Sequence, residues 1–319
     1  MFHQFRGDSI YTQGQMSLST CVLLPAWNAE QSIRRALNAL GRLDPPPDQI
    51  VLVNDGSTDS TCLEFSTFQT NPVTDLIAVC LRENCGASAA RNFGLQVATA
   101  DIVIMADADD ESLPDRISTH LDSFHRFPEA WLSIVGQERS YSSGVTKVPA
   151  TQGHSTAKSF EDYLRFLLLG DAGERSPELF SFPTSSMALR RKQIVSLGGF
   201  DPHYRRVEDV ELCLRVLASG GVIASTSSVG VRRRLGSTSP ETVVSNYLSE
   251  IQLIKQYGSN LVNRRERKLA LLRAKARRDY LLRSRGKFVV EILSTILLSP
   301  RSQLPIVRRA MRYRLGLGS

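Results

Sequence analysis

Residues 98–111, Ala-Thr-Ala-Asp-Ile-Val-Ile-Met-Ala-Asp-Ala-Asp-Asp-Glu, decide the fold that we predict. The apolar run at 102–106 predicts a short strand buried on both faces. The four acids within 107–111 repel one another unless a positive group lies among them. Ligands of open α/β sheets bind at this end of the strands, and a divalent cation carrying a diphosphate would satisfy both conditions. The alternative is a solvated acidic turn, because residues 112–115 (Ser-Leu-Pro-Asp) form a good helix cap.

Strands and helices alternate on both sides of this stretch. Apolar residues at helical spacing, such as Ile33, Leu37 and Leu40, follow the first predicted strand. Alternating elements with short connections predict an α/β fold with a mainly parallel, doubly wound sheet. The predicted strands of this half are residues 19–25, 50–53, 76–81 and 102–106.

The second part of the chain is less regular. Residues 141–156 and 170–183 are rich in Ser, Thr, Gly and other loop-forming residues, so both segments are predicted as loops. The helix predicted at 208–218 has Leu212 and Val216 on its apolar face and ends at two glycines. The other predicted elements are strands at 131–135, 185–189 and 222–231, and helices at 160–168 and 192–197.

Charge is distributed unevenly along the 319 residues. The net charge is +7, but residues 261–319 contain 16 Lys and Arg against 3 acids, whereas residues 1–260 contain 23 basic and 29 acidic residues. A weakly acidic body is therefore followed by a strongly basic tail.

Targeting and redox signals are sparse. No run approaches the roughly 18–20 apolar residues that span a bilayer, and residues 1–19 are polar without a signal core. The five cysteines are odd in number and lack C-x-x-C spacing, so neither a disulfide framework nor a zinc site is expected. We therefore predict a cytoplasmic protein with reduced thiols.

Five segments in this order resemble family 2 glycosyltransferases: STCVLLPAWNAE (19–30), IVLVNDGSTD (50–59), ENCGASAARNFGL (83–95), MADADD (105–110) and GGFDPHYRRVEDVELCLR (198–215). The resemblance implies an inverting enzyme of hexosyltransferase type with the GT-A fold, a Rossmann-like, mostly parallel mixed sheet flanked by helices. It covers about residues 18–240. We therefore divide the chain into an N-terminal tail (1–17), a GT-A domain (18–238) and a basic, mostly helical C-terminal extension (239–319).

The resemblance also implies donor-binding positions. In the family, the nucleotide base lies at the end of the first strand and an acid of the second turn accepts from the base edge. Asp55 could accept from uracil N3–H, which favours UDP-sugars, although thymidine presents the same edge. Without the family, a turn residue is the alternative for Asp55, and a surface helix arginine is the alternative for Arg91. The positions implied for donor binding are Pro25, Ala26, Trp27, Glu30, Asp55 and Arg91.

Two acid pairs match the family's reacting groups. Asp107 matches the acid that leans toward the ribose, and Asp109 matches the ligand of Mn²⁺ or Mg²⁺, which neutralises the leaving diphosphate. Glu208 and Asp209 match the pair at a helix start, with Asp209 as general base. The alternative is that these two acids only complement the helix dipole.

One segment departs from the family pattern. Many relatives have an R-x-H-x-x-S segment whose His can complete the metal site, but residues 232–237 are Arg-Arg-Arg-Leu-Gly-Ser, with Arg234 at the His position. Arginine does not ligate metals but can clamp phosphate. Weaker metal dependence is therefore expected.

The basic tail allows two interpretations. Residues 264–287 are dense in charge, and apolar residues within 288–297 form a wide face. This pattern suits contact with an anionic membrane surface or a helix packed on the catalytic domain. Nucleic-acid binding is not expected, because interleaved aromatic residues are absent. The expected acceptor is a glycan or a lipid-linked glycan. A non-catalytic nucleotide-sugar or membrane-surface binding protein is the alternative function.

Overall fold

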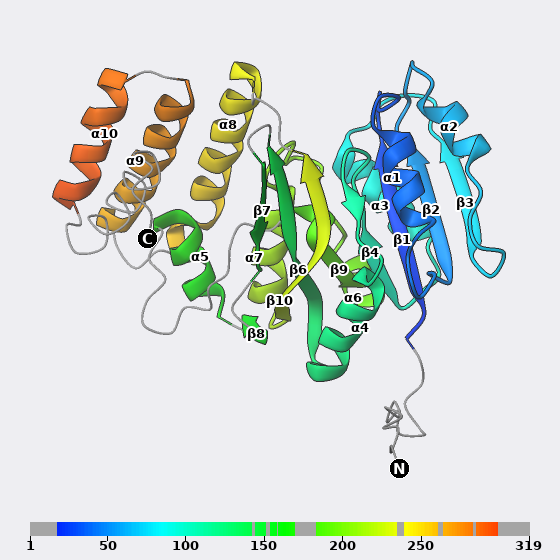
Figure 1. The fold of residues 1–319 in the computed structure, drawn as a ribbon. Helices are drawn as coiled ribbons and strands as arrows, with labels where there is room; N and C mark the ends of the chain where they lie inside the picture. Colours follow the sequence, from blue (N-terminus) through cyan, green and yellow to red (C-terminus); the bar gives the residue numbers. More distant parts are fainter. Residues whose placement is uncertain are drawn as a thin grey trace, which may run out of the picture.

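The computed structural model describes residues 18–141, 144–150, 154–157, 159–169, 183–234, 239–260, 264–282 and 285–298. Within them, ten strands form a mixed sheet in the order β3-β2-β1-β4-β9-β6-β10-β5, with β7 paired to β6 and β8 paired to β10. Helices flank the sheet (Figure 1). The N-terminal tail 1–17 and most of the expected loop 170–183 lie outside the described residues.

The N-terminal half has the predicted parallel order. β1 (Thr20–Ala26) lies between β2 (Gln49–Asn54) and β4 (Ile102–Met105), and it runs parallel to both strands. All residues of these three strands are buried, as their continuous apolar runs predict. The remaining elements of this half are β3 (Asp75–Cys80), α1 (Ile33–Leu40), α2 (Thr61–Thr67) and α3 (Ala87–Val97).

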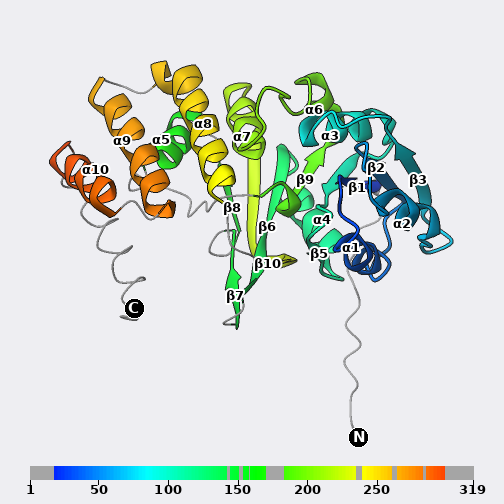
Figure 2. The ribbon, with the colours of Figure 1, turned by 90° about the horizontal axis from the view of Figure 1, so that it is seen from above.

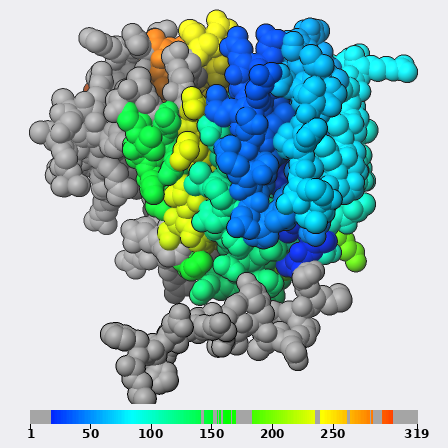
Figure 3. Space-filling view, turned by 45° about the vertical axis from the view of Figure 1, so that its right-hand side comes forward, coloured from blue at the N-terminus to red at the C-terminus, as the bar shows by residue number. Residues whose placement is uncertain are grey.

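Close packing places α3 against β1. A Cβ atom built on Gly94 would lie 2.1 Å from Leu23 Cδ1, so only glycine permits this approach of helix and strand. Arg91 lies on the same helix and is thereby brought beside the end of β4, where the acids follow. Figure 3 shows this half, in blue to cyan, as one continuous surface beside a narrower band of later elements in green and yellow.

The second half combines parallel and antiparallel strands. β9 (Met187–Arg190) is antiparallel to both β4 and β6 (Ala130–Tyr141), whereas β6 is parallel to β10 (Val222–Arg234). β5 is the short strand Glu111–Ser112, which pairs with β10. The helices of this half are α4 (Arg116–Arg126), α5 (Phe160–Leu169), α6 (Arg191–Ser196) and α7 (Glu208–Ala218).

The expectation of a loop over residues 141–156 is wrong for its described parts. β7 (Gly144–Val148) pairs with β6, and β8 (His154–Ala157) pairs with β10. β7 is an exposed edge strand whose residues are almost all solvent-accessible. It therefore lacks the apolar alternation by which a half-buried strand is recognised in a sequence.

The C-terminal extension packs on the catalytic domain through α8 (Pro240–Tyr257) and α9 (Arg264–Leu281). Buried residues of both helices, including Leu253 and Leu269, belong to the same apolar core cluster as the residues of α7 and β4. Tyr204 donates a hydrogen bond to Gln256 Oε1 over 2.6 Å, and Tyr257 donates one to Glu211 Oε1 over 2.9 Å. Of the two interpretations of the tail, packing on the catalytic domain is therefore the one observed for α8 and α9.

The last described helix, α10 (Arg285–Leu298), packs beside α9. In both ribbon views the extension lies at one end of the molecule and β3 lies at the other end (Figures 1 and 2). None of the described helices is both long enough and apolar enough to cross a membrane.

The expectation of reduced thiols is wrong for one cysteine pair. Cys62 on α2 and Cys80 at the end of β3 form a disulfide, whereas Cys21, Cys85 and Cys213 are free. Their separation of 18 residues in the sequence gave no recognisable motif. The disulfide fastens α2 to the strand at the edge of the sheet.

Candidate active site

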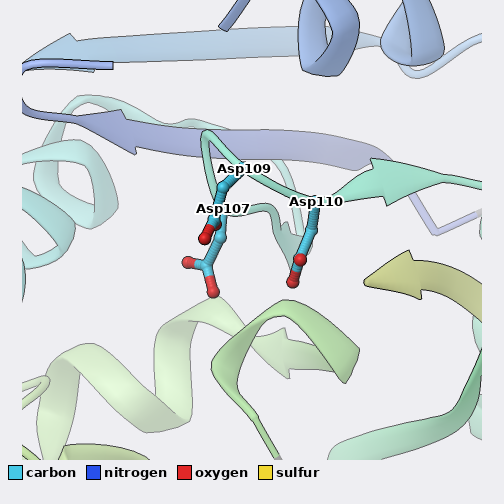
Figure 4. Close-up of side chains that lie close together, drawn as sticks. All are labelled: Asp107, Asp109 and Asp110. Carbon is cyan, nitrogen blue, oxygen red and sulfur yellow. The ribbon is translucent and has the colours of Figure 1, made fainter. Parts of the chain in front are cut away.

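Three carboxylates meet where β4 ends. The chain turns after Ala106, and the Asp110 N–H donates to Asp107 O over 3.2 Å. As a result, Asp107, Asp109 and Asp110 each offer an oxygen atom within 4.8 Å of the others. Figure 4 shows the three side chains pointing to the same side of this turn. Carboxylate oxygens at this spacing suit Mg²⁺ or Mn²⁺, which prefer hard oxygen ligands.

The electrostatics of this acidic cluster also suit a cation. Burial and the Asp107 carboxylate raise the pKa of Asp109 above its usual value. Burial and Asp107 likewise raise the pKa of Asp110 to about 7. The solvated turn considered as an alternative is excluded for Asp110, which is buried. A bound cation would stabilise the charged forms of these acids.

Asp110 had no role assigned from the sequence, although it directly follows the D-x-D pair. Its Oδ2 accepts a hydrogen bond from Ser185 Oγ over 2.6 Å and from Arg233 Nε over 3.0 Å. It therefore joins the end of β4 to the segment before β9 and to β10. The signal that could have identified it is the third acid of the MADADD segment.

Arg91 connects the two acid pairs predicted from the sequence. Its guanidinium lies 3.1 Å from Asp107 Oδ1 and 2.7 Å from Glu208 Oε1, and it stacks 5.5 Å from the centre of the Phe200 ring. Burial opposes its charge, but the two carboxylates outweigh burial and raise the pKa of Arg91. The interpretation as a surface arginine is therefore wrong, because Arg91 is a buried bridge.

Asp209 lies in the first turn of α7 and has few partners among the described residues. Its Oδ1 accepts a hydrogen bond from the Val210 N–H over 2.8 Å. Burial and the neighbouring Glu208 carboxylate raise the pKa of Asp209 to about 7. A carboxyl group with such a pKa can accept a proton near neutral pH. Val207, just before the two acids, has φ 58°, which is rare for a β-branched residue and typical of functional sites.

A cavity of about 540 Å³ contains these groups. Asp107, Asp109 and Asp209 line it, and its wall continues to α8 and α9. Arg233 also lines this cavity. Arg234, the residue predicted at this place, has a side chain that is 60% exposed and lies 3.5 Å from Glu111 Oε1.

The positions expected to bind the base lie at the ends of β1 and β2. Pro25 and Ala26 are buried at the end of β1, whereas Trp27 is 56% exposed. Glu30 Oε2 accepts a hydrogen bond from the Ser60 N–H over 3.2 Å, which links the start of α1 to that of α2. Trp27 is thus an aromatic side chain of this group that is open to a ligand.

Asp55 is buried and already occupied by hydrogen bonds. Its carboxylate accepts from the N–H groups of Cys85 and Gly86 over 2.8 and 2.9 Å, and from Asn84 Nδ2 over 3.0 Å. Asp55 therefore holds the segment that leads into α3. A carboxylate has about four acceptor positions, so one position remains for a base edge.

The chain resembles known glycosyltransferases in both sequence and fold. The model of the family "Glycosyl transferase family 2" matches residues 21–195. The amylovoran biosynthesis glycosyltransferase AmsE of Erwinia amylovora is 26% identical over 241 residues, which cover 73% of this chain and 84% of AmsE.

Two solved structures have the same architecture. The structure of S. aureus TarS 1–349 in complex with UDP matches with a TM-score of 0.55 at 16% identity, covering 94% of this chain and 92% of that one. The mannosyltransferase PcManGT from Pyrobaculum calidifontis, in complex with GDP-Man and Mn²⁺, matches with a TM-score of 0.58 at 16% identity, covering 95% and 85%. The predicted GT-A fold is confirmed.

Proposed function

The chain belongs to glycosyl transferase family 2 and is a glycosyltransferase, and we propose that it moves a sugar with inversion from a nucleotide-diphosphate sugar to an acceptor hydroxyl. One observation carries this proposal: the cavity that contains Asp107 and Asp109 also contains Asp209, a carboxyl group with a pKa of about 7. At this place a cation held by the acids could neutralise the charge of the leaving diphosphate. Asp209 could accept the proton of the acceptor hydroxyl.

The proton step is assigned to Asp209. Its carboxylate accepts the acceptor's O–H proton while that oxygen attacks the anomeric carbon. The bond from the anomeric carbon to the phosphate oxygen breaks, and its electron pair leaves with the nucleoside diphosphate. This single displacement inverts the anomeric configuration. Glu208 is a positioning residue, because its carboxylate is taken by Arg91.

The donor diphosphate is placed at the acidic cluster. Asp109, with Asp107 and Asp110, would hold Mn²⁺ or Mg²⁺, which supplies positive charge to the leaving diphosphate. Mn²⁺ is present in the PcManGT complex. Arg233 lines the same cavity and can add a phosphate contact of its own.

The nucleotide is placed at the ends of β1 and β2, beside the exposed Trp27 ring and the remaining acceptor position of Asp55. We favour UDP, because a carboxylate can accept from uracil N3–H. The acceptor then enters from the opposite side, where the cavity wall is formed by α8 and α9. We propose a glycan or a lipid-linked glycan as the acceptor.

Calorimetric titration of UDP, with and without Mn²⁺, tests the donor assignment. Binding that requires Mn²⁺ is expected if the acidic cluster holds the metal. Binding that does not require a metal would indicate that arginine side chains bind the diphosphate directly. If UDP does not bind under either condition while dTDP or GDP does, the uridine assignment is wrong. If no nucleotide diphosphate binds, the proposed donor class is wrong.

Contact with a membrane surface is a second, separate proposal. On α10, Val290, Leu293 and Leu297 are 63%, 55% and 79% exposed, and their spacing places them on one side of the helix. Together with the basic tail, this side suits an anionic bilayer surface. The full chain should co-sediment with anionic vesicles at low salt, and Leu293→Glu/Leu297→Glu should abolish this. Equal sedimentation of both proteins would refute the proposal.

A further inference from the structure

Two arginines lie in the cavity wall close in sequence to Asp209, the proposed general base. Arg205 and Arg206 immediately precede Val207, and both are exposed and line the cavity that contains Asp209. Among the described parts of the chain, neither has a carboxylate partner within salt-bridge distance. Within these parts of the chain, each therefore presents to the cavity a positive charge that no carboxylate balances.

Two further arginines of the same wall come from α9, but their charges are balanced. Arg277 forms an ion pair with Glu250. Arg278 lies 2.8 Å from Asp279 Oδ1 and 4.6 Å from the centre of the Tyr247 ring. These contacts hold the two guanidinium groups in place, and the net positive charge of the wall comes from Arg205 and Arg206.

Arg205 and Arg206 line the same cavity as the acidic cluster, and we assign them to a different ligand from the donor diphosphate. The diphosphate is assigned to the acidic cluster after β4, where Arg91 and Arg233 supply the nearby protein cations. Tyr204, the residue before Arg205, donates a hydrogen bond to Gln256 of α8, so the two arginines lie at the part of the cavity wall that we assign to the acceptor. An anionic group on the acceptor would thus be held beside Asp209.

A second cavity, of about 330 Å³, adjoins this wall and is mainly apolar. The two cavities share Val207, Val210, Ala274, Glu250 and Arg277. Further apolar side chains of the second cavity come from α5, α7, α8 and α9, among them Leu167, Leu168, Leu214, Leu253 and Ile254. A cationic wall joined to an apolar cavity fits a ligand with an anionic head and an apolar segment.

We propose that Arg205 and Arg206 bind a phosphate group of an amphiphilic acceptor, whose apolar segment enters the adjoining cavity. This inference rests on the proposed function, because it takes Asp209 to mark the acceptor side. Arginine is suited to this task, since its planar guanidinium binds phosphate through paired hydrogen bonds.

The test uses the full chain saturated with UDP and Mg²⁺, so that the donor side is filled. Farnesyl phosphate and inorganic phosphate are titrated separately by calorimetry. Farnesyl phosphate should bind at least about tenfold more tightly than inorganic phosphate, because only the former buries apolar surface. Equal affinities would overturn the assignment of the apolar cavity.

Variants test the arginines directly. Arg205→Gln/Arg206→Gln should weaken farnesyl phosphate binding by about tenfold or more, since two charge-assisted contacts are lost, whereas Arg205→Lys/Arg206→Lys should retain most of it. Arg42→Gln/Arg126→Gln removes two exposed charges away from the cavity and serves as the matched control. Unchanged farnesyl phosphate binding in the Gln variant would overturn the proposal.

The nucleotide titration distinguishes a failure of the acceptor subsite from a failure of the proposed function. A parallel loss of UDP affinity in Arg205→Gln/Arg206→Gln would assign these arginines to the donor and overturn the acceptor subsite. If the unmodified protein binds no nucleotide diphosphate, the proposed function fails. Farnesyl phosphate titrated without nucleotide then still shows whether the Arg205 and Arg206 phosphate site exists.

Discussion

Asp55, directly after β2, and Asp209, in the first turn of α7, are both acids of the candidate active site, but their surroundings differ. Asp55 accepts three hydrogen bonds from residues 84–86. Asp209 accepts one, from Val210, and its pKa is raised to about 7. A carboxylate that accepts three hydrogen bonds from one segment organises that loop, whereas one left with few partners and a raised pKa is available for chemistry.

The largest effect is expected for Asp209→Asn. Removal of the base should lower sugar transfer by about 10²- to 10⁴-fold, while UDP binding persists. The melting temperature should be unchanged or higher at pH 8, because the variant removes a partly buried charge. Full turnover by this variant would show that Asp209 is not the base.

Asp55→Ala should mainly lower stability. It leaves three donors of residues 84–86 without their acceptor, so the free energy of unfolding should fall by about 2–4 kcal/mol, as measured by urea denaturation. The free energy of unfolding of Asp55→Asn, which keeps one acceptor oxygen, should lie between those of the unmodified protein and Asp55→Ala. UDP affinity should fall as well, because the acceptor position proposed for uracil N3–H is lost with the carboxylate. A loss of UDP affinity at unchanged stability would show that Asp55 serves the nucleobase alone and does not hold residues 84–86.

The pH dependence of transfer should reflect Asp209. The base must be deprotonated, so the rate should rise as pH increases through about 7, by roughly tenfold per pH unit on the acidic limb. The folded-state pKa lies above the unfolded value, so this carboxyl's contribution to stability decreases as pH rises from about 4 to 7. A rate independent of pH between 5.5 and 8 would contradict the assignment.

The smallest effect is expected for Arg234→Gln. Arg234 is largely exposed, and exposed ion pairs contribute about 1 kcal/mol or less, so metal-free UDP affinity should change by less than about threefold. Arg233→Gln removes the cavity-lining partner of Asp110 and should reduce that affinity more, by about tenfold. The reverse order would support the role of Arg234 expected from the sequence.

Arg233 and Arg234 are neighbours in the sequence, but their side chains have different surroundings. Successive residues of a strand point to opposite faces, and in β10 Arg232 and Arg234 contact Glu138 and Glu111. Arg233 points the other way, to Asp110. Three consecutive arginines do not reveal their register, so matching to the family pattern selected Arg234.

Other parts of the chain were predictable for physical reasons. β1, β2 and β4 are apolar on both faces and were recognised, and the acids after β4 and at the start of α7 were placed at one site. The strand β7 was not recognised, because its residues are exposed. The Arg91 bridge depends on residues 16 and 117 positions away from it, which no local pattern encodes.

The antiparallel pairing of β4 with β9 has a consequence for synthesis of the chain. β4 ends at Met105, but its partner begins at Met187, so roughly 80 residues are translated before that edge can be covered. At about 5–20 residues per second, the apolar Ile-Val-Ile-Met edge stays open for about 4–16 s on the ribosome. Nascent chains are exposed to edge-to-edge aggregation during this interval, and slower translation of residues 106–190 lengthens it.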